Sequence, residues 1–176
     1  MYQEKETTLA GIHEAVAAVT ERCSGLSEDF ATEHHIPGKW SIAEQVVHLI
    51  VATRAPGKAF GMPKLAIRAF GSSSKGSRDY DAMAEFYQSQ LVNVPARTGF
   101  EPDLRGKPFA EIMEKWQGSA RLFDDNLPRW SEKELDKRQL PHPLLGKITL
   151  REMLFFTHHH IYHHLKQIDR LLEFRD

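Results

Sequence analysis

The feature that most constrains the fold is the helical spacing of the apolar residues, which recurs in four long segments. These segments are residues 3–24, 42–55, 108–127 and 150–174, and each places apolar side chains three or four positions apart. No segment of comparable length alternates apolar and polar residues, and no Asn-Gly pair indicates a tight hairpin turn. The pattern therefore predicts an all-α fold, a four-helix bundle with long connections.

Capping patterns mark where the second and the last of these helices begin. Ser41 and Glu44 form an S-x-x-E box, in which each side chain satisfies a free amide of the first helical turn. Thr149 and Glu152 repeat this box at the start of the last helix. The residue before a proline avoids the helical region, so we expect the second helix to end just before Pro56.

The stretches between the long helices have weaker patterns. Residues 62–70 and 81–93 are expected to form short helices, whereas the Gly- and Ser-rich residues 71–77 are typical of a flexible loop. Residues 95–107 are expected to be loop, with proline and glycine as helix breakers. Residues 131–147 are expected to form a connection, and strand signals are weak throughout.

Length and composition limit the classes of protein to consider. A chain of 176 residues is expected to form one helical-bundle domain over residues 1–176. The formal net charge of −1 gives no reason to expect nucleic acid as a partner. No apolar run reaches about 18 residues, which argues against a membrane partner. The polar first residues do not resemble a secretory signal.

The single cysteine, Cys23, is compatible with a reducing cytoplasm, where we expect the protein to be located. A free cysteine can also be a nucleophile. Cys23 continues the apolar spacing of the first helix, however, and free cysteines are among the most buried residue types. We therefore interpret Cys23 as a small core residue.

The last predicted helix carries a cluster of five histidines. On a helical wheel of about 100° per residue, His160 and His164 lie beside the apolar stripe, and their spacing of four lets both imidazoles reach one ion. His159 and His163 have the same spacing but point to a charged, solvated face that also carries Glu152, Lys166 and Arg170. His158 lies at the opposite edge of the stripe. Spacing alone leaves two alternatives open for the first pair, a metal site or ordinary hydrogen-bonded histidines.

A third candidate ligand is His48, at the edge of the apolar face of the second helix. Three neutral imidazoles with one free position form a known catalytic metal site, whereas two imidazoles would bind weakly. His48 can join only if the second helix packs beside the last one, and a surface histidine is the competing interpretation. Gln167, three positions after His164, is a candidate for orienting a ligand or a bound water, or else a partly exposed glutamine.

Familiar zinc motifs do not fit the chain. The H-E-x-x-H pattern needs glutamate after the first ligand, but Ile161 follows His160. A zinc finger needs paired cysteines. No residue stands out as a general base, so the catalytic residues are unknown. Basic residues after the second helix could attract an acidic substrate, although a solvated loop is the simpler interpretation. They are Lys58, Lys64, Arg68, Lys75 and Arg78.

Three short motifs, in this order, resemble the DinB/YfiT-like metal-dependent hydrolase superfamily. The first is the W-S…H-L segment at residues 40–49, the second is the lead-in at residues 143–150, and the third is H-I-Y-H-H-L-K-Q-I at residues 160–168. Many members have glycine where this chain has Lys166. Residues 57–107 match no known pattern.

The resemblance implies a four-helix bundle with a divalent metal ion, Zn²⁺ or Ni²⁺, held by His48, His160 and His164. Characterised relatives include transferases and isomerases that use small thiols such as bacillithiol or mycothiol. The expected partner is therefore a small-molecule substrate such as a low-molecular-weight thiol, and the favoured function is a metal-dependent thiol S-transferase or hydrolase. The alternatives are a non-catalytic metal-binding or stress-related bundle and a helical interaction domain. The sequence does not determine the oligomeric state, and a homodimer is one alternative.

Overall fold

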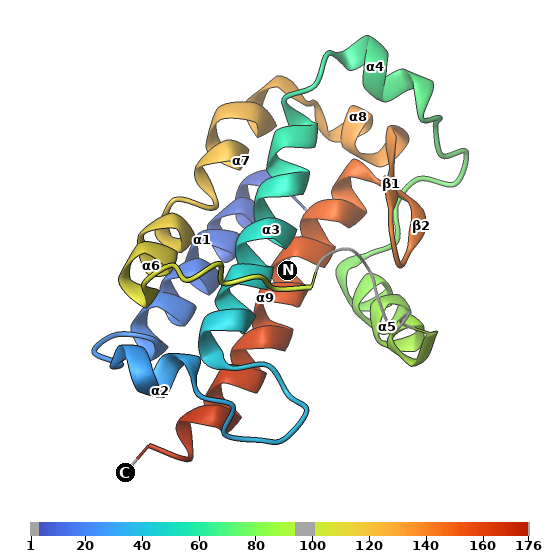
Figure 1. The fold of residues 1–176 in the computed structure, drawn as a ribbon. Coiled ribbons are helices and arrows are strands. Elements are labelled where there is room, and N and C mark those ends of the chain that lie inside the picture. Colours follow the sequence, from blue (N-terminus) through green and yellow to red (C-terminus); the bar gives the residue numbers. More distant parts are fainter. Residues whose placement is uncertain (1–3, 94–100, 176) are drawn as a thin grey trace.

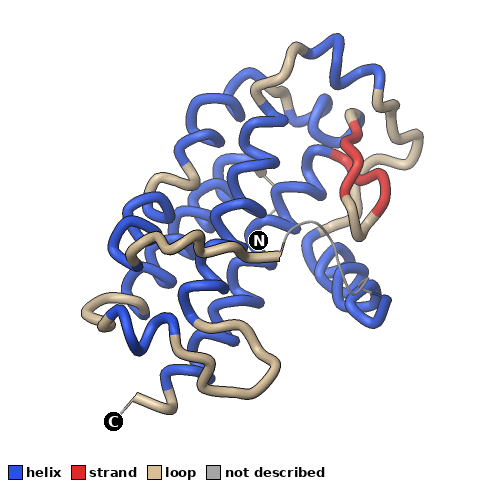
Figure 2. The backbone as a smooth tube through the Cα atoms, viewed as in Figure 1, coloured by secondary structure: helices blue, strands red, loops and turns tan. Residues whose placement is uncertain are grey.

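The chain folds into a bundle of long helices with a small hairpin at one end (Figures 1 and 2). This computed structural model describes residues 4–93 and 101–175. The helices are α1 (Lys5–Arg22), α2 (Glu28–Thr32), α3 (Ile42–Phe60), α4 (Lys64–Ala69), α5 (Tyr80–Gln90), η1 (Leu91–Asn93), α6 (Phe109–Gln117), α7 (Arg121–Asn126), η2 (Leu127–Arg129), α8 (Glu132–Lys137) and α9 (Leu150–Leu172). The strands are β1 (Gln139–His142) and β2 (Gly146–Thr149).

The core of the molecule is a four-helix bundle, so the predicted all-α fold is confirmed. Helix α9 packs against α1 and α3, and the successive helices α6 and α7 complete the bundle against α3 and α1 (Figure 1). Two indole groups tie the chain across this core, since the Nε1 of Trp116 donates to the Val16 carbonyl and that of Trp130 to the Phe60 carbonyl. The largest fully buried side chains include Trp116, Trp130, Phe60, Phe123, Phe155, Ile12, Ile42 and Leu49.

Both predicted capping boxes are confirmed. The Ser41 amide donates to Glu44 Oε2 at 2.8 Å, and the Glu44 amide donates back to Ser41 Oγ at 3.2 Å. The Thr149 and Glu152 pair repeats this exchange at 2.7 and 3.1 Å. These boxes begin α3 and α9, the two helices that carry the candidate metal ligands, so local sequence fixes where each helix starts.

Helix α3 continues past Pro56, and the prediction that it ends there was wrong. It runs to Phe60, with Pro56 and Gly57 buried inside it. Gly57 allows a close approach to α7, because an added Cβ would lie 2.8 Å from the Leu122 Cβ. The Asn126 side-chain amide also donates to the Gly57 carbonyl at 3.2 Å. Packing against α7 compensates for the loss of the backbone hydrogen bond that a proline removes from a helix.

The helix predicted over residues 108–127 is in fact two helices. A turn at residues 118–120 separates α6 from α7, and within it the Ser119 amide donates to the Trp116 carbonyl at 2.8 Å. Gly118 lies at this break, where its low helix propensity favours an interruption. The bend lets Trp116 and Phe123 both reach the core, although each lies on a different helix.

The connection predicted at residues 131–147 contains regular structure that the sequence analysis missed. A third capping box, Ser131 with Glu134, starts α8. The antiparallel strands β1 and β2 then pair Leu140 with Ile148 and lead directly into α9. Four-residue strands are too short for an alternating pattern to stand out from noise.

The shorter predicted elements are mostly confirmed. Helix α4 lies within residues 62–70, and α5 with η1 covers residues 80–93. Residues 71–77 form a loop, which an isolated bridge between Ser72 and Arg138 attaches to the start of the hairpin. In the predicted loop at 95–107, residues 101–107 have no helix or strand, and residues 95–100 lie outside the described residues.

Candidate metal centre

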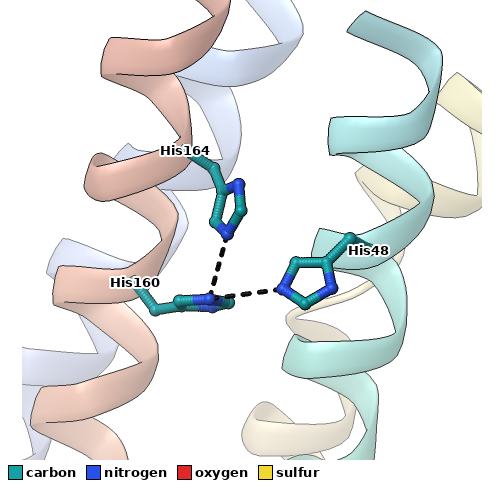
Figure 3. Close-up of side chains that lie close together, drawn as sticks. All are labelled: His48, His160 and His164. Carbon is teal, nitrogen blue, oxygen red and sulfur yellow. Dashed lines mark hydrogen bonds between the residues drawn. The ribbon is translucent and has the colours of Figure 1, made fainter. Parts of the chain in front are cut away.

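The structure brings His48, His160 and His164 together between α3 and α9 (Figure 3). Nε2 of His160 lies 3.3 Å from Nε2 of His48 and 3.0 Å from Nε2 of His164. One ring nitrogen from each residue lies within 4.8 Å of those of the other two. Helices α3 and α9 pack side by side, which is the condition that His48 needs to reach the pair. The role of the three residues as metal ligands stays a prediction.

The spacing of these nitrogens fits a metal ion. Zinc–nitrogen bonds of about 2.0–2.1 Å at a tetrahedral angle place two ligand nitrogens about 3.3 Å apart. The two Nε2 separations of 3.0 and 3.3 Å are close to this value. The three rings also point their Nε2 atoms toward one another rather than toward separate partners (Figure 3). An imidazole donor set of this kind suits Zn²⁺ and Ni²⁺.

Gln45 fixes the tautomer of one ring. Nδ1 of His164 lies 2.5 Å from the Gln45 side-chain oxygen, and because an amide oxygen can only accept, Nδ1 must carry the proton. In a neutral imidazole, Nε2 of His164 then keeps its lone pair, which faces His160 and His48. Gln45 is 6% exposed and one turn before His48 on α3. Sequence reasoning gave it no role, because its contact with His164 crosses the interface between α3 and α9.

Burial keeps the two α9 ligands neutral. His160 and His164 are each 7% exposed. Loss of solvation lowers the pKa of both imidazoles well below the ordinary 6.5, and the neighbouring histidines lower them further. A neutral ring keeps the lone pair that a metal requires. His160 and His164 could therefore bind an ion at neutral pH without first losing protons.

Aromatic rings pack on the ligands from two ends of the cluster. The Trp40 ring stacks on His164 with centroids 6.2 Å apart and also lies 5.0 Å from the His48 ring. Phe156, one turn before His160 on α9, stacks on that imidazole at 4.9 Å. These rings limit both the rotation of the ligands and the access of water to their faces.

The other histidines of α9 do not form the solvated face that the helical wheel predicts. His159 and His163 are half-buried, because α5 covers this side of α9. The Gln88 amide donates to Nε2 of His159 at 3.1 Å, and the Tyr80 hydroxyl is hydrogen-bonded to Nδ1 of His158 at 2.7 Å. A wheel of one helix cannot show where another helix will dock. These histidines therefore attach α5 to the bundle.

The burial of Cys23 and Gln167 bears on the roles expected for them from the sequence. Cys23 is 3% exposed, and burial raises the pKa of its thiol to about 12, so its interpretation as a core residue is confirmed. Gln167 is half-buried, and its predicted support of the site stays a prediction.

Two of the basic residues after α3 have structural partners. Lys64 pairs with Glu134 at 2.7 Å. Arg78 pairs at 2.7 Å with Glu152, a buried residue that the helical wheel placed on the charged face of α9. These two cations therefore attach α4 and the loop before α5 to the rest of the chain.

Comparison with known proteins adds one match. The sequence model of a protein family, the DinB superfamily, matches residues 12–168. This span begins in α1 and ends near the end of α9, and it contains all three convergent histidines. A search of curated proteins finds no match to the chain.

Proposed function

The chain belongs to the DinB superfamily, and from this membership and its three convergent imidazoles we propose that it is a metal-dependent enzyme. His48, His160 and His164 would hold a divalent ion, Zn²⁺ or Ni²⁺, through Nε2 and leave one coordination position for a reactant. The observation that carries this proposal is the pair of Nε2 separations, 3.0 Å within α9 and 3.3 Å between α9 and α3, two helices far apart in the sequence.

The chemistry follows from three uncharged ligands. A divalent ion with only neutral imidazoles around it supplies nearly its full charge, which lowers the pKa of a thiol or a water at the free position. The protein contributes the arrangement of the ligands. Burial keeps His160 and His164 neutral, and Gln45 holds His164 in the tautomer with Nε2 unprotonated. Trp40 and Phe156 shield the ring faces.

We infer two reaction classes for such a site. A thiol S-transferase would form a carbon–sulfur bond from a low-molecular-weight thiol, with release of chloride and a proton from a chloroarene or with opening of an epoxide C–O bond, whose oxygen takes the proton. A hydrolase would break an ester or amide bond by adding the hydroxyl of water to the acyl carbon and its hydrogen to the leaving group. In either case the substrate is a small molecule. No residue is assigned as a general base.

The setting of this proposed activity is the reducing cytoplasm. Cys23 is a free, buried thiol, which suits that compartment. Among residues 4–93 and 101–175, no helix has the length and apolar character of a membrane span. The proposal includes no nucleic-acid partner, in keeping with the formal net charge of −1.

Metal analysis of protein purified without an affinity tag tests the metal site. We expect about one Zn²⁺ or Ni²⁺ per chain, and the His160→Ala variant is expected to lose it. The His13→Ala variant is the control, because it removes a histidine of α1 that is bonded to Asp124 and lies outside the cluster. Untagged protein that lacks metal and takes up neither ion would overturn the proposal.

Turnover tests the enzymatic part. The metal-loaded protein is incubated with small thiols and either a chloroarene or an epoxide, and the thioether product is measured. Hydrolysis of ester and amide substrates is measured in parallel. We expect activity that His160→Ala abolishes. A metal-loaded protein that is inactive in every assay would instead support the non-catalytic metal-binding bundle.

A further inference from the structure

Helix α5 inserts one aromatic side chain among the histidines of α9. Tyr87 is 3% exposed, and its ring meets four rings of α9 edge-on, with centroids 5.3–5.8 Å away and interplanar angles of 75–90°. These four residues are Phe156, His159, His160 and His163. Their positions i, i+3, i+4 and i+7 form the hole into which a side chain of a neighbouring helix packs.

One member of this hole, His160, belongs to the candidate metal centre. Helix α9 lies between α3 and α5 (Figure 1). The His160 ring thus has His48 of α3 as one neighbour, with Nε2 atoms 3.3 Å apart, and Tyr87 of α5 as another, with centroids 5.8 Å apart and rings perpendicular. Tyr87 is therefore a direct contact between α5 and a candidate ligand.

Packing, rather than hydrogen bonding, orients His160. His164 has Gln45 to hold its Nδ1, but the hydrogen bonds of His160 within the described residues both involve Nε2 and lead to His48 and His164. What remains to set the angle of the ring is the stacked Phe156 at 4.9 Å and the perpendicular Tyr87. If the Tyr87 ring is removed, the imidazole gains freedom to turn its Nε2 away from the other two.

We propose that Tyr87 is a positioning residue of the metal centre, and that metal binding and the docking of α5 on α9 therefore stabilise each other. The proposal rests on the metal binding proposed above. An ion that fixes the His160 ring also fixes one wall of the hole that receives Tyr87. By linkage, the factor by which docked α5 raises metal affinity equals the factor by which metal favours the docked helix.

Three variants of α5 test the positioning role through the affinity for Zn²⁺, measured by competition with a chromophoric chelator. Tyr87→Leu is expected to bind Zn²⁺ about tenfold more weakly, the size of effect that follows loss of a group supporting a ligand. Tyr87→Phe keeps the ring and is expected to bind like wild type. Tyr80→Leu is the matched control, because Tyr80 also packs on α9, where its ring meets Phe155, His158 and His159, none of which is a candidate ligand. Its affinity is expected to stay within about twofold of wild type.

Hydrogen exchange of the wild-type protein tests the coupling without any substitution. Saturating Zn²⁺ is expected to slow amide exchange in α5 about tenfold, and Tyr87→Leu is expected to lose this response while its far-UV circular dichroism stays helical. Equal Zn²⁺ affinity of wild type and Tyr87→Leu, or equal weakening by Tyr87→Leu and Tyr80→Leu, would overturn the positioning role while metal binding itself stands. A wild-type protein that binds no Zn²⁺ would overturn both proposals.

Discussion

Gln45 accepts a hydrogen bond from Nδ1 of His164, and this contact joins α3 to α9 directly behind the convergent imidazoles. It also selects the tautomer that turns the lone pair of Nε2 toward His48 and His160. A neutral amide thereby does for His164 what a carboxylate or a backbone carbonyl does for many metal-binding histidines. The candidate metal centre thus depends on a residue that is not itself a candidate ligand.

Replacement of Gln45 tests this dependence. Gln45→Ala is expected to weaken Zn²⁺ binding by about 10–100-fold, the usual effect of removing a group that orients a ligand. Gln45→Glu keeps an acceptor at this position and is expected to retain more of the affinity. Gln88→Ala is the control, since Gln88 bonds to His159 outside the cluster. Equal affinities in a Zn²⁺ competition assay for wild type and Gln45→Ala would contradict the assigned role.

Metal binding should also raise thermal stability, and only through the three convergent histidines. At a free Zn²⁺ concentration of about 100 times Kd, a ligand specific to the folded state adds about 2.7 kcal/mol to the free energy of unfolding. In a chain of this size, that corresponds to a rise in Tm of about 5–10 °C. Scanning calorimetry should show this rise for wild type and the control His13→Ala but not for His48→Ala. A comparable rise for His48→Ala would remove that residue from the site.

The hairpin makes stability depend on pH. Nδ1 of His142 accepts the amide hydrogens of Leu144 and Leu145 at 3.2 and 3.1 Å, so this nitrogen must be unprotonated. Burial lowers the pKa of His142 to about 4. The unfolded chain, with a pKa near 6.5, then binds the proton more readily, so stability falls as pH drops from about 6.5 to about 4 and is unaffected above that range.

The His142→Asn variant isolates this contribution. Asparagine offers an oxygen to the same amides but does not titrate. Urea unfolding of metal-free protein at pH 7 and pH 5 should show a loss of stability smaller by about 2 kcal/mol in the variant than in wild type. An identical loss in both proteins would show that another group causes the acid sensitivity.

Gly57 and Gly118 are expected to respond to alanine with opposite signs. Alanine normally stabilises a helix by up to about 1 kcal/mol relative to glycine. At Gly57, however, the new Cβ would lie 2.8 Å from the Leu122 Cβ, so we expect a loss of about 1–3 kcal/mol. At Gly118 the nearest atom is a carbonyl oxygen 3.8 Å away, and alanine is expected to be neutral or stabilising. Chemical denaturation measures both, and a stable Gly57→Ala variant would show that α3 and α7 can separate there at little cost.

The main helices were predictable because their information is local. The Ser41 and Thr149 boxes and the apolar spacing of α9 each lie within a few turns of chain. The course of α3 beyond Pro56 was not predictable in this way, because it depends on packing against Leu122 and Asn126, more than 60 positions away. The break at Gly118 was missed because a single glycine within an apolar helical pattern favours an interruption only weakly.

The residues of the candidate site were also only partly predictable from the sequence. Helix geometry alone selects His160 and His164 over His159 and His163, and the first pair is the more deeply buried in the structure. Gln45 and Tyr87 could not be chosen from spacing, because each acts across an interface between two helices. The position of α5, which buries the histidines outside the cluster, is a tertiary property that no single-helix wheel contains.

The positions of His48 and His160 are 112 apart in the sequence. An ion bound to both would hold α3 against α9 in the folded chain. Such an ion stabilises the fold through its binding free energy, which grows with the ratio of free ion concentration to Kd. The single cysteine of this chain has no partner for an internal disulfide. The three histidines proposed to take part in a reaction would then also hold the fold together. Chelators should therefore accelerate unfolding of the protein as well as stop its proposed activity.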